Sequence, residues 1–258
     1  MPSSSEHNRI KNTSIRLSTD GFSFATLQDN GYLESGTYIV DPARSMGANL
    51  TSMLDKTELD RKAVSTASVI IPESRYTLIP QALFEEERAR EILGACISLK
   101  DTEEASWNSL LESTEMLLFP IDSTIKEILE ERFLDAKISF TCQSKLLLDM
   151  ESKGKKLFRQ LTAHYENGLL TLLCREEGMI KAVRTIPTKT VSDVIYYILN
   201  IFQSLNMDQE KDYLKLVAQE KDLQGLMRHL SRFIQNIQPQ AMEEDHLTLH
   251  KENLTCGS

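Results

Sequence analysis

No stretch of the 258-residue sequence approaches the roughly 18 consecutive apolar residues that a membrane-spanning helix needs. The opening residues, MPSSSEHNRIKNT, also lack the apolar segment that is typical of a secretory signal peptide. We therefore expect a cytoplasmic protein with no direct membrane insertion.

Positive charge is also scarce. Lys and Arg number 29 against 38 Asp and Glu, which gives a net charge of −9 at pH 7 and a pI near 5.2. A broad surface for nucleic acid or for an anionic membrane needs the opposite balance. We therefore predict that nucleic acid is not a partner.

The four cysteines are scattered along the chain as Cys96, Cys142, Cys174 and Cys256. Their spacing matches neither a zinc ribbon nor a disulfide-dense secreted scaffold, so we expect free thiols in a reducing compartment. Cys142 and Cys174 lie in apolar, strand-like segments, where burial raises the pKa of a thiol and makes it unreactive. A cysteine nucleophile is therefore not predicted.

Glycine is too sparse to build a glycine-rich phosphate loop. The chain has 10 glycines, and neither GxxxxGK[ST] nor GxGxxG occurs. In HLTLH, His246 and His250 would share a helix face as metal ligands with Cys256 nearby, but the catalytic Glu of HExxH is missing and the segment is expected to be a tail. We predict no catalytic residue, no metal ligand and no cofactor.

What the sequence does contain is enough apolar material for a sizeable core, 41% of all residues. Residues 1–12 are polar and are expected to form a disordered tail, and residues 239–258, which begin at Pro239, are expected to form a polar tail. In between, over 13–238, the apolar period switches repeatedly between 2 and 3.6, which indicates an α/β fold.

The first part of this body begins with three short β-rich runs, SIRLST, GFSFATLQ and GYLESGTYIV. They are separated by Asp20-Gly21 and Asn30-Gly31, dipeptides that favour tight hairpin turns, so we predict an antiparallel meander. Helical spacing of apolar residues then predicts a helix over about 44–60, and an apolar run predicts a buried strand over 67–71.

The second half repeats this order. FRQLTAHY, LLTLLC and MIKAVRTI predict another meander, with a turn at Asn167-Gly168 and with His164 on the polar face of its strand. Thr190 and Asp193 form a capping pair for the next helix. A strand near 213–217, a further helix and a closing strand at 233–237 follow. The predicted core of this half contains Leu161, Leu170, Leu172, Ile195, Ile198 and Phe202.

The segment between the two copies, about 76–152, is longer. It is expected to contain a helix over 82–93, an apolar stretch over 116–121, a helix that begins at Asp122-Ser123, a strand over 137–141 and a helix over 143–151. We place the boundary between the two lobes near Gly154, which gives lobes of residues 13–153 and 154–238.

The segments STDGFSFATL, YTLIPQALF (76–84), ILEERFLDAKISF (128–140) and the meander and helix from Phe158 to Leu205 resemble an uncharacterised bacterial family, a domain of unknown function. That family has a duplicated ribonuclease-H-like, actin-like ATPase fold and is distantly similar to pilus-platform and cell-division actin-like proteins. The resemblance implies two ribonuclease-H-like lobes, of which the first is enlarged by an inserted subdomain.

Catalytic members of that superfamily hold nucleotide phosphates with one Asp-x-Gly hairpin per lobe and admit adenosine beside a Gly-Gly pair. In this sequence Asp20 and Gly21 are adjacent and precede Phe22, and a type I′ turn explains both residues. The second hairpin, 163–168, has no Asp-x-Gly, and 187–189 (Pro-Thr-Lys) has no glycine. The first strand, IRLST, also lacks the carboxylate that a ribonuclease-H nuclease would need.

Two hypotheses of different class follow. The first is a non-catalytic actin-like scaffold or adaptor, with a degenerate nucleotide site, that binds a protein partner of unknown identity. The alternative is an atypical ATPase or phosphotransferase that uses Asp20. Self-assembly into a homo-oligomer or filament is a third, weaker hypothesis.

Overall fold

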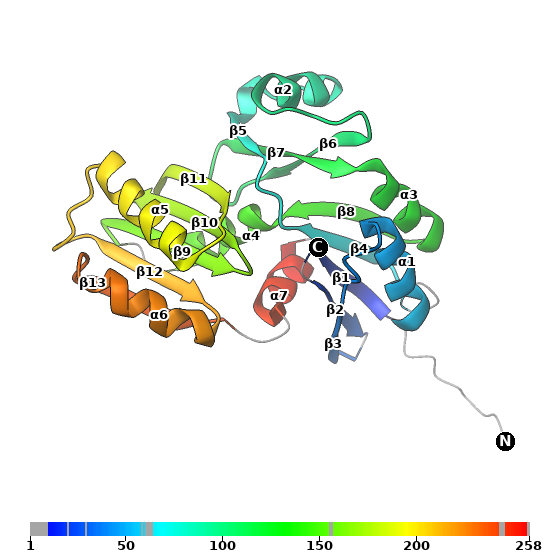
Figure 1. The fold of residues 1–258 in the computed structure, drawn as a ribbon. Coiled ribbons are helices and arrows are strands. Elements are labelled where there is room, and N and C mark those ends of the chain that lie inside the picture. The colour runs from blue at the N-terminus through cyan, green and yellow to red at the C-terminus, as the bar shows by residue number, and fades with distance from the viewer. Residues whose placement is uncertain are drawn as a thin grey trace. The chain divides into compact units, whose positions relative to one another are not determined.

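A computed structural model describes residues 10–19, 21–28, 30–57, 59, 64–154, 157–242 and 246–256. The chain divides into two compact units. The first unit comprises residues 1–109, 114–146 and 245–258, and the second comprises residues 110–113 and 147–244. Each unit contains one five-stranded mixed sheet, and the two sheets have equivalent strand orders (Figure 1).

The first sheet starts with the predicted meander, formed by β1 (Ile10–Ser18), β2 (Gly21–Gln28) and β3 (Leu33–Tyr38). The prediction that 1–12 is a disordered tail is wrong for residues 10–12, which belong to β1. It is followed by α1 (Met46–Thr57) and β4 (Thr66–Ile71), as the apolar spacing predicted. β4 pairs in parallel with both β1 and β8 (Lys137–Cys142). The resulting strand order is β3-β2-β1-β4-β8.

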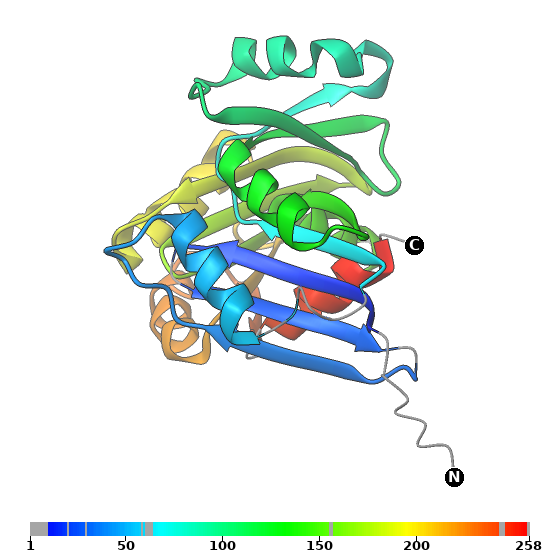
Figure 2. The same cartoon turned by 90° about the vertical axis from the view of Figure 1, so that its right-hand side faces the viewer.

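The two faces of this sheet differ, because successive side chains of a strand point to opposite sides. Ile15 and Val69 lie on the apolar face and pack with Leu50 and Met53 of α1 in one core. On the opposite face β1 carries polar side chains, and α7 (Leu247–Cys256) packs there against β1, β2 and β4. In Figure 2, α1 (the blue helix) lies in front of the sheet and α7 (red) lies behind it.

The inserted segment contains more strand than the sequence predicted. Its elements are β5 (Thr77–Pro80), two short 3₁₀ turns (Gln81–Leu83 and Glu86–Arg88), α2 (Ala89–Cys96), β6 (Glu103–Ser109), β7 (Glu115–Asp122) and α3 (Ser123–Arg132). The strands form a sheet of order β5-β7-β6. The predicted helix over 82–93 is wrong in its first half, because α2 begins only at Ala89. β6 was not predicted: its sequence, EEASWNS, has little strand propensity, and it is a strand because it pairs with β7 along its whole length.

The second unit repeats the topology of the first. Its elements are β9 (Arg159–Glu166), β10 (Leu169–Glu176), β11 (Met179–Pro187), α5 (Val191–Ser204), β12 (Tyr213–Ala218), α6 (Glu220–Leu230) and β13 (Asn236–Ala241), with the strand order β11-β10-β9-β12-β13. Of the six predicted core residues, Leu161, Leu170, Leu172, Ile198 and Phe202 are buried. Ile195 is partly buried and packs against the same core.

The C-terminal part of the chain differs from the sequence prediction. The prediction that 239–258 is a polar tail is wrong for β13 and for α7, and the closing strand starts at Asn236 rather than at residue 233. Pro239 does not end the fold, because β13 is an edge strand, where a residue without an N–H group is tolerated. α7 follows the second unit in sequence but belongs to the first.

α4 (Gln143–Lys153) leads from one unit to the other, and the division between the units falls within it, between Leu146 and Leu147. Gly154 follows the last residue of this helix.

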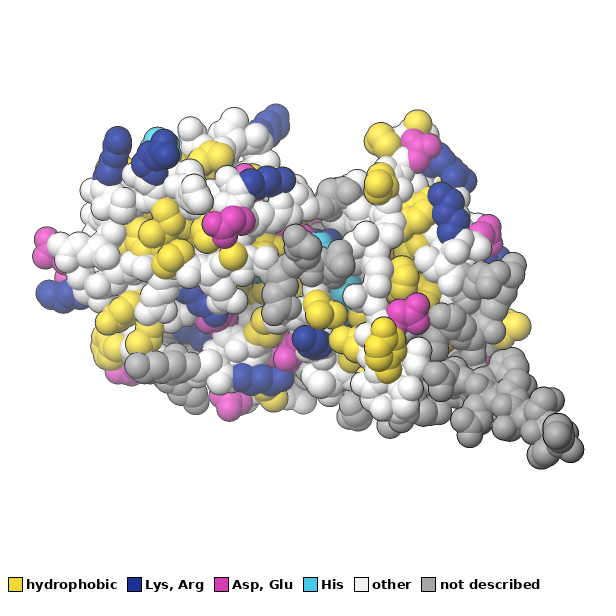
Figure 3. Space-filling model, turned by 90° about the horizontal axis from the view of Figure 1, so that it is seen from below, with side chains coloured by type: hydrophobic (Ala, Val, Ile, Leu, Met, Phe, Trp, Pro, Cys, Tyr) yellow, Lys and Arg dark blue, Asp and Glu magenta, His cyan; other side chains and the backbone are white. Residues whose placement is uncertain are grey.

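On the face of the molecule seen in Figure 3, Lys and Arg side chains lie scattered among acidic and polar ones. Among the described residues no helix is long and apolar enough to span a membrane.

Candidate functional site

The β9–β10 hairpin of the second unit occupies the place where the sequence resemblance implies a phosphate-binding turn. Glu166 pairs with Leu169, so the loop consists of Asn167 and Gly168 alone. Both residues have positive φ, 46° and 79°, as in a type I′ turn, and the sequence predicted a turn at this position. A Cβ atom on Gly168 would lie 3.0 Å from the carbonyl oxygen of Thr188, so the turn and the loop before α5 are in close contact.

The loop before α5 is hydrogen-bonded to this turn. The carbonyl oxygen of Gly168 accepts hydrogen bonds from the backbone N–H of Thr188 at 2.6 Å and from its hydroxyl at 3.1 Å. The first turn of α5 is closed by the predicted capping pair: Thr190 Oγ1 accepts from the N–H of Asp193 at 3.2 Å, and Asp193 Oδ2 accepts from the N–H of Thr190 at 2.8 Å.

Asp193 Oδ2 also accepts a hydrogen bond from the N–H of Lys189 at 3.0 Å. The N–H groups of Lys189 and Thr190 hold the pKa of the Asp193 carboxyl below its usual value. Exposed N–H groups at the start of a helix are a ready anion site. Here the N–H groups of residues 188, 189, 190 and 193 already donate to acceptors of the chain itself, and one of those acceptors is a carboxylate.

The strand before this turn carries buried polar side chains on the face opposite the core. His164 is 6% exposed and Glu166 is 3% exposed. The sequence placed His164 on this polar face, as an ordinary surface or hydrogen-bonded residue, and did not predict its burial. His164 pairs with Thr171 of β10, whose hydroxyl lies 3.0 Å from that of Thr185 in β11. A buried polar row therefore crosses three strands.

The equivalent hairpin of the first unit differs from its prediction. Ser18 pairs with Gly21, and Gly21 is already the first residue of β2. The prediction that Gly21 is a turn residue is therefore wrong. Asp20, the residue on which the ATPase alternative depends, lies outside the described residues.

Arg16 is a buried charge that sequence analysis did not single out. It lies in the middle of β1 on the polar face and is only 2% exposed. Its Nε donates a hydrogen bond of 2.8 Å to Oε1 of Gln143, which is also buried. The signal in the sequence was an arginine in a strand that otherwise alternates small polar and apolar residues. A guanidinium thus lies on the strand where a ribonuclease-H nuclease would carry a carboxylate.

α7 is joined to the first sheet by a buried hydrogen-bond network. His250 is fully buried, and its Nδ1 and Nε2 lie 2.8 Å and 2.9 Å from the hydroxyls of Ser14 and Ser23. Asn253 donates to Ser14 Oγ at 2.8 Å and accepts from Ser68 Oγ at 3.0 Å. Burial is the main reason why the pKa of His250 falls to about 3. His250 therefore serves as a neutral packing residue with both ring nitrogens engaged.

The described residues contain no cluster of three or more His, Cys, Asp or Glu that could hold a metal ion.

The thiols of Cys142 and Cys174 are buried, as the sequence predicted. Burial raises the pKa of Cys142 to about 12 and that of Cys174 to about 11, whereas Cys96 is exposed. The prediction that the two strand cysteines are unreactive core residues agrees with this burial.

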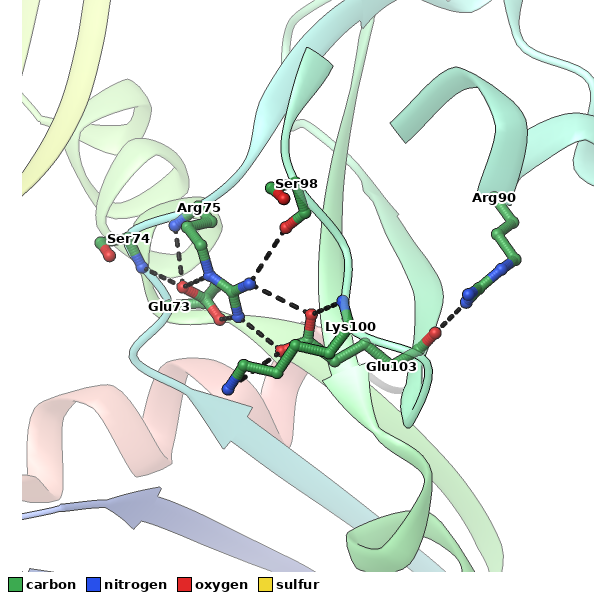
Figure 4. Close-up of polar contacts among 7 residues, drawn as sticks. All are labelled: Glu73, Ser74, Arg75, Arg90, Ser98, Lys100 and Glu103. Atoms are coloured by element: carbon green, nitrogen blue, oxygen red, sulfur yellow. Dashed lines mark hydrogen bonds and ion pairs between the residues drawn. The ribbon is translucent and has the colours of Figure 1, made fainter. Parts of the chain in front are cut away.

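A second polar cluster lies at the base of the inserted subdomain (Figure 4). Arg75 contacts both oxygens of Glu103, at 2.7 Å and 3.1 Å, and also Glu73 at 3.0 Å. The hydrogen bond from Arg75 is the main cause that lowers the pKa of Glu103. Glu73 also accepts from the N–H groups of Ser74 and Arg75, and Glu103 accepts from the N–H of Lys100.

Every carboxylate oxygen of Glu73 and Glu103 thus has a partner within the chain. The cluster ties the segment between β4 and β5 to the loop before β6, and Arg90 adds a hydrogen bond to the backbone oxygen of Glu103. Carboxylates engaged in this way are unsuited to the roles of general base or metal ligand. We interpret the cluster as a structural link.

Comparisons with known proteins agree with this architecture. The sequence model of a family described as "Protein of unknown function (DUF3822)" matches residues 3–237. A crystal structure of a Bacteroides thetaiotaomicron protein, described as having an actin-like ATPase fold and unknown function, has a TM-score of 0.85 and 27% identity and covers 97% of this chain and 99% of that one. No curated protein matches the sequence.

Two more distant structures show the fold alone. A PilM-PilN type IV pilus biogenesis complex matches with a TM-score of 0.55 at 11% identity, covering 95% of each chain. The ethanolamine utilization protein EutJ from Carboxydothermus hydrogenoformans matches with a TM-score of 0.52 at 10% identity, covering 94% of this chain and 88% of that one. The predicted fold class, an actin-like ATPase fold with two sheet cores, is confirmed.

Proposed function

The chain belongs to the DUF3822 family of proteins of unknown function, and we propose that it is a non-catalytic actin-like scaffold or adaptor that binds a protein partner. In this proposal the nucleotide site is degenerate. The fold is retained for the surfaces that it presents, and a fold by itself does not imply its usual chemistry.

The observation that carries the proposal is that the N–H groups of residues 188, 189, 190 and 193, around the start of α5, already donate to acceptors of the chain. A bound triphosphate needs several backbone donors directed at its oxygens, together with a metal ion held by carboxylates. Here Gly168 accepts the hydrogen bond from the N–H of Thr188, and Asp193 accepts those from the N–H groups of Lys189 and Thr190. Phosphate would have to displace a carboxylate that already sits on these donors, and the two negative charges would repel each other.

Arg16 in the first unit supports the same conclusion. A nuclease or phosphotransferase of the two-metal type needs converging carboxylates on the first strand. β1 instead presents a buried guanidinium held by Gln143, whose positive charge opposes the binding of a cation nearby.

The proposal of a protein partner has separate support. One of the similar structures is a PilM-PilN complex, so a chain of this fold has been found together with another protein. We extend this role to the present chain without carrying over the identity of the partner. A cytoplasmic location is part of the proposal, because the cysteines among the described residues are free thiols, as expected in a reducing compartment.

Isothermal titration and thermal unfolding with Mg·ATP test the loss of the nucleotide site. We expect no heat of binding and no stabilisation, whereas a ligand present at 100 times its dissociation constant would add about 2.7 kcal/mol. A dissociation constant below about 100 μM that is abolished by Asp20→Ala, but not by Asp135→Ala at an exposed position of the same unit, would refute the proposal. That result would favour the atypical ATPase or phosphotransferase.

A pull-down from the native host, with the full chain as bait, tests whether a protein partner binds and identifies it. Light scattering of the purified protein, with and without nucleotide, separates a scaffold for another protein from a self-assembling filament. A mass that grows with protein concentration or with nucleotide would favour self-assembly.

A further inference from the structure

The side of the first sheet that α7 covers is polar. β1, β2 and β4 place Ser14, Arg16, Ser23 and Ser68 there, and each of these residues is at most 8% exposed. The apolar core that the opposite side of the sheet forms with α1 contains no residue of α7. α7 is therefore packed on the sheet without being part of that core.

Hydrogen bonds make up much of the contact between α7 and the sheet. Over 247–255 the buried side chains of α7 are Leu249 and Leu254, which are apolar, and His250 and Asn253, which are polar. Asn253 accepts from the hydroxyl of Ser68 at 3.0 Å and donates to its backbone oxygen at 3.2 Å. Water can replace such bonds when the two surfaces separate. A segment with few buried apolar contacts opens at a lower cost than the whole domain.

The imidazole of His250 makes this contact dependent on pH. Its two ring nitrogens lie 2.8 Å and 2.9 Å from the hydroxyls of Ser14 and Ser23. A neutral imidazole has one donor and one acceptor nitrogen for such a pair, whereas an imidazolium has two donors and a charge. Burial opposes that charge most, followed by the charges of His246 in α7 and Arg16 in β1. β2 and β4 contain no charged side chain that could offset them.

We propose that α7 is a pH-dependent cover of the first sheet: it leaves the polar side as one segment while the sheet and α1 stay folded, and protonation of His250 favours this open state. Opening uncovers the hydroxyls of Ser14, Ser23 and Ser68 beside the guanidinium of Arg16. The inference concerns a conformational equilibrium of the first unit and does not depend on the proposed scaffold function.

The direction of the pH effect follows from the proton balance. In the docked state the pKa of His250 is about 3, lowered mainly by burial, whereas in the open state the solvated imidazole has its ordinary pKa of 6.5. The open state therefore binds more protons below pH 6.5, so the equilibrium constant for opening rises as the pH falls. Between pH 8 and pH 5 it should rise about 30-fold.

Ser68→Cys places a thiol beneath α7, because Ser68 is 8% exposed and bonded to Asn253. A dipyridyl disulfide, which still reacts with thiols at pH 5, should label this thiol only when α7 is open. Peptide mass spectrometry gives the labelling rate in the full chain, and the rate of a short cysteine peptide at the same pH normalises it. We expect the normalised rate to rise about 30-fold from pH 8 to pH 5 and to exceed that of Cys142 at both pH values.

Two histidine variants of the Ser68→Cys protein separate the cause. His250→Gln removes the titrating group and should abolish the rise, whereas His229→Gln, at an exposed position of α6, should leave it unchanged. Amide exchange of α7 in the unsubstituted chain, relative to an unfolded peptide at the same pH, should increase by the same factor. This second measurement decides the question if Ser68→Cys itself displaces α7. Far-UV circular dichroism at pH 5 should show that the fold is retained.

Three results would overturn the inference. Equal normalised rates for the introduced thiol and Cys142 would mean that α7 leaves the sheet only when the whole chain unfolds. A rate of opening that does not change with pH, or a rise that His250→Gln leaves intact, would exclude His250 as the cause. None of these results depends on Mg·ATP or on a partner, so this inference and the scaffold proposal fail separately.

Discussion

The buried His250 makes the stability of the first unit sensitive to pH. Its ordinary pKa is 6.5, and in the fold it falls to about 3, mainly through burial, with smaller contributions from the positive charges of His246 and Arg16. Because the folded pKa lies below the unfolded one, the unfolded chain binds more protons in this range. Stability is therefore complete above pH 6.5 and is lost progressively as the pH falls towards 3.

The size of the effect follows from the two pKa values. At pH 5 the ratio of protonated to neutral imidazole of residue 250 is about 30 in the unfolded chain, while the imidazole of the folded chain stays neutral. This difference lowers the free energy of unfolding by about 2 kcal/mol relative to pH 8. Protonation would also require one ring nitrogen to give up its role as acceptor from the hydroxyl of Ser14 or Ser23.

Urea unfolding at pH 8 and pH 5, followed by circular dichroism, measures this loss. His250→Gln removes the titrating group and keeps a donor and an acceptor, so the variant should be less stable at pH 8 but should lose about 2 kcal/mol less than the wild type between the two pH values. His229→Gln, at an exposed position of α6, is the matched control and should behave as the wild type. An identical pH dependence of His250→Gln and wild type would refute the reasoning.

Two further predictions concern the cores. Ile198→Ala removes a fully buried side chain from the second-unit core and should cost about 2–5 kcal/mol in urea unfolding; a loss within about 0.5 kcal/mol would mean that this face of α5 is assigned wrongly. In the native protein a thiol reagent should label Cys96 rapidly and should leave Cys142 and Cys174 unlabelled, because burial excludes the reagent and disfavours the thiolate, as peptide mass spectrometry would detect. Labelling of all three at equal rates would contradict their assigned burial.

Local sequence signals predicted most of the two sheets. The meanders, α1, α5 and the turn at Asn167-Gly168 each carry their own signal, either an apolar period or a residue pair with a fixed conformational preference. The capping pair Thr190 and Asp193 was predictable for the same reason, because its partners are three residues apart.

The elements that were not predicted depend on distant partners. β6 has a polar sequence and becomes a strand by pairing with β7, and α7 has a weak apolar pattern because two of its buried side chains over 247–255, His250 and Asn253, are polar. Pro239 suggested an end of the fold, yet it is accommodated at a sheet edge that only the strand order defines. Edge position and burial are properties of the assembled sheet, so no local period reveals them.

Some features of the candidate site could likewise be predicted from the sequence, and others could not. The missing Asp-x-Gly and Gly-Gly elements were visible in the sequence, which was sufficient to argue against a nucleotide site of the superfamily type. The sequence did not reveal the acceptor of the Thr188 hydrogen bonds before α5, because Thr188 and Gly168 are 20 positions apart. Likewise, the burial of Arg16 requires Gln143, which lies 127 residues further along the chain.

The sequence by itself determined the fold class, the duplication and the turn and cap chemistry, because these follow from periodicity and from contacts within a few residues. Only the tertiary structure decided that residues 247–256 form a helix of the first unit, that His250 is a buried neutral side chain and that the N–H of Thr188, before α5, donates to Gly168. His250 and Ser14 are 236 residues apart. Their contact, and the burial that lowers the pKa of the imidazole, exist only in the folded chain.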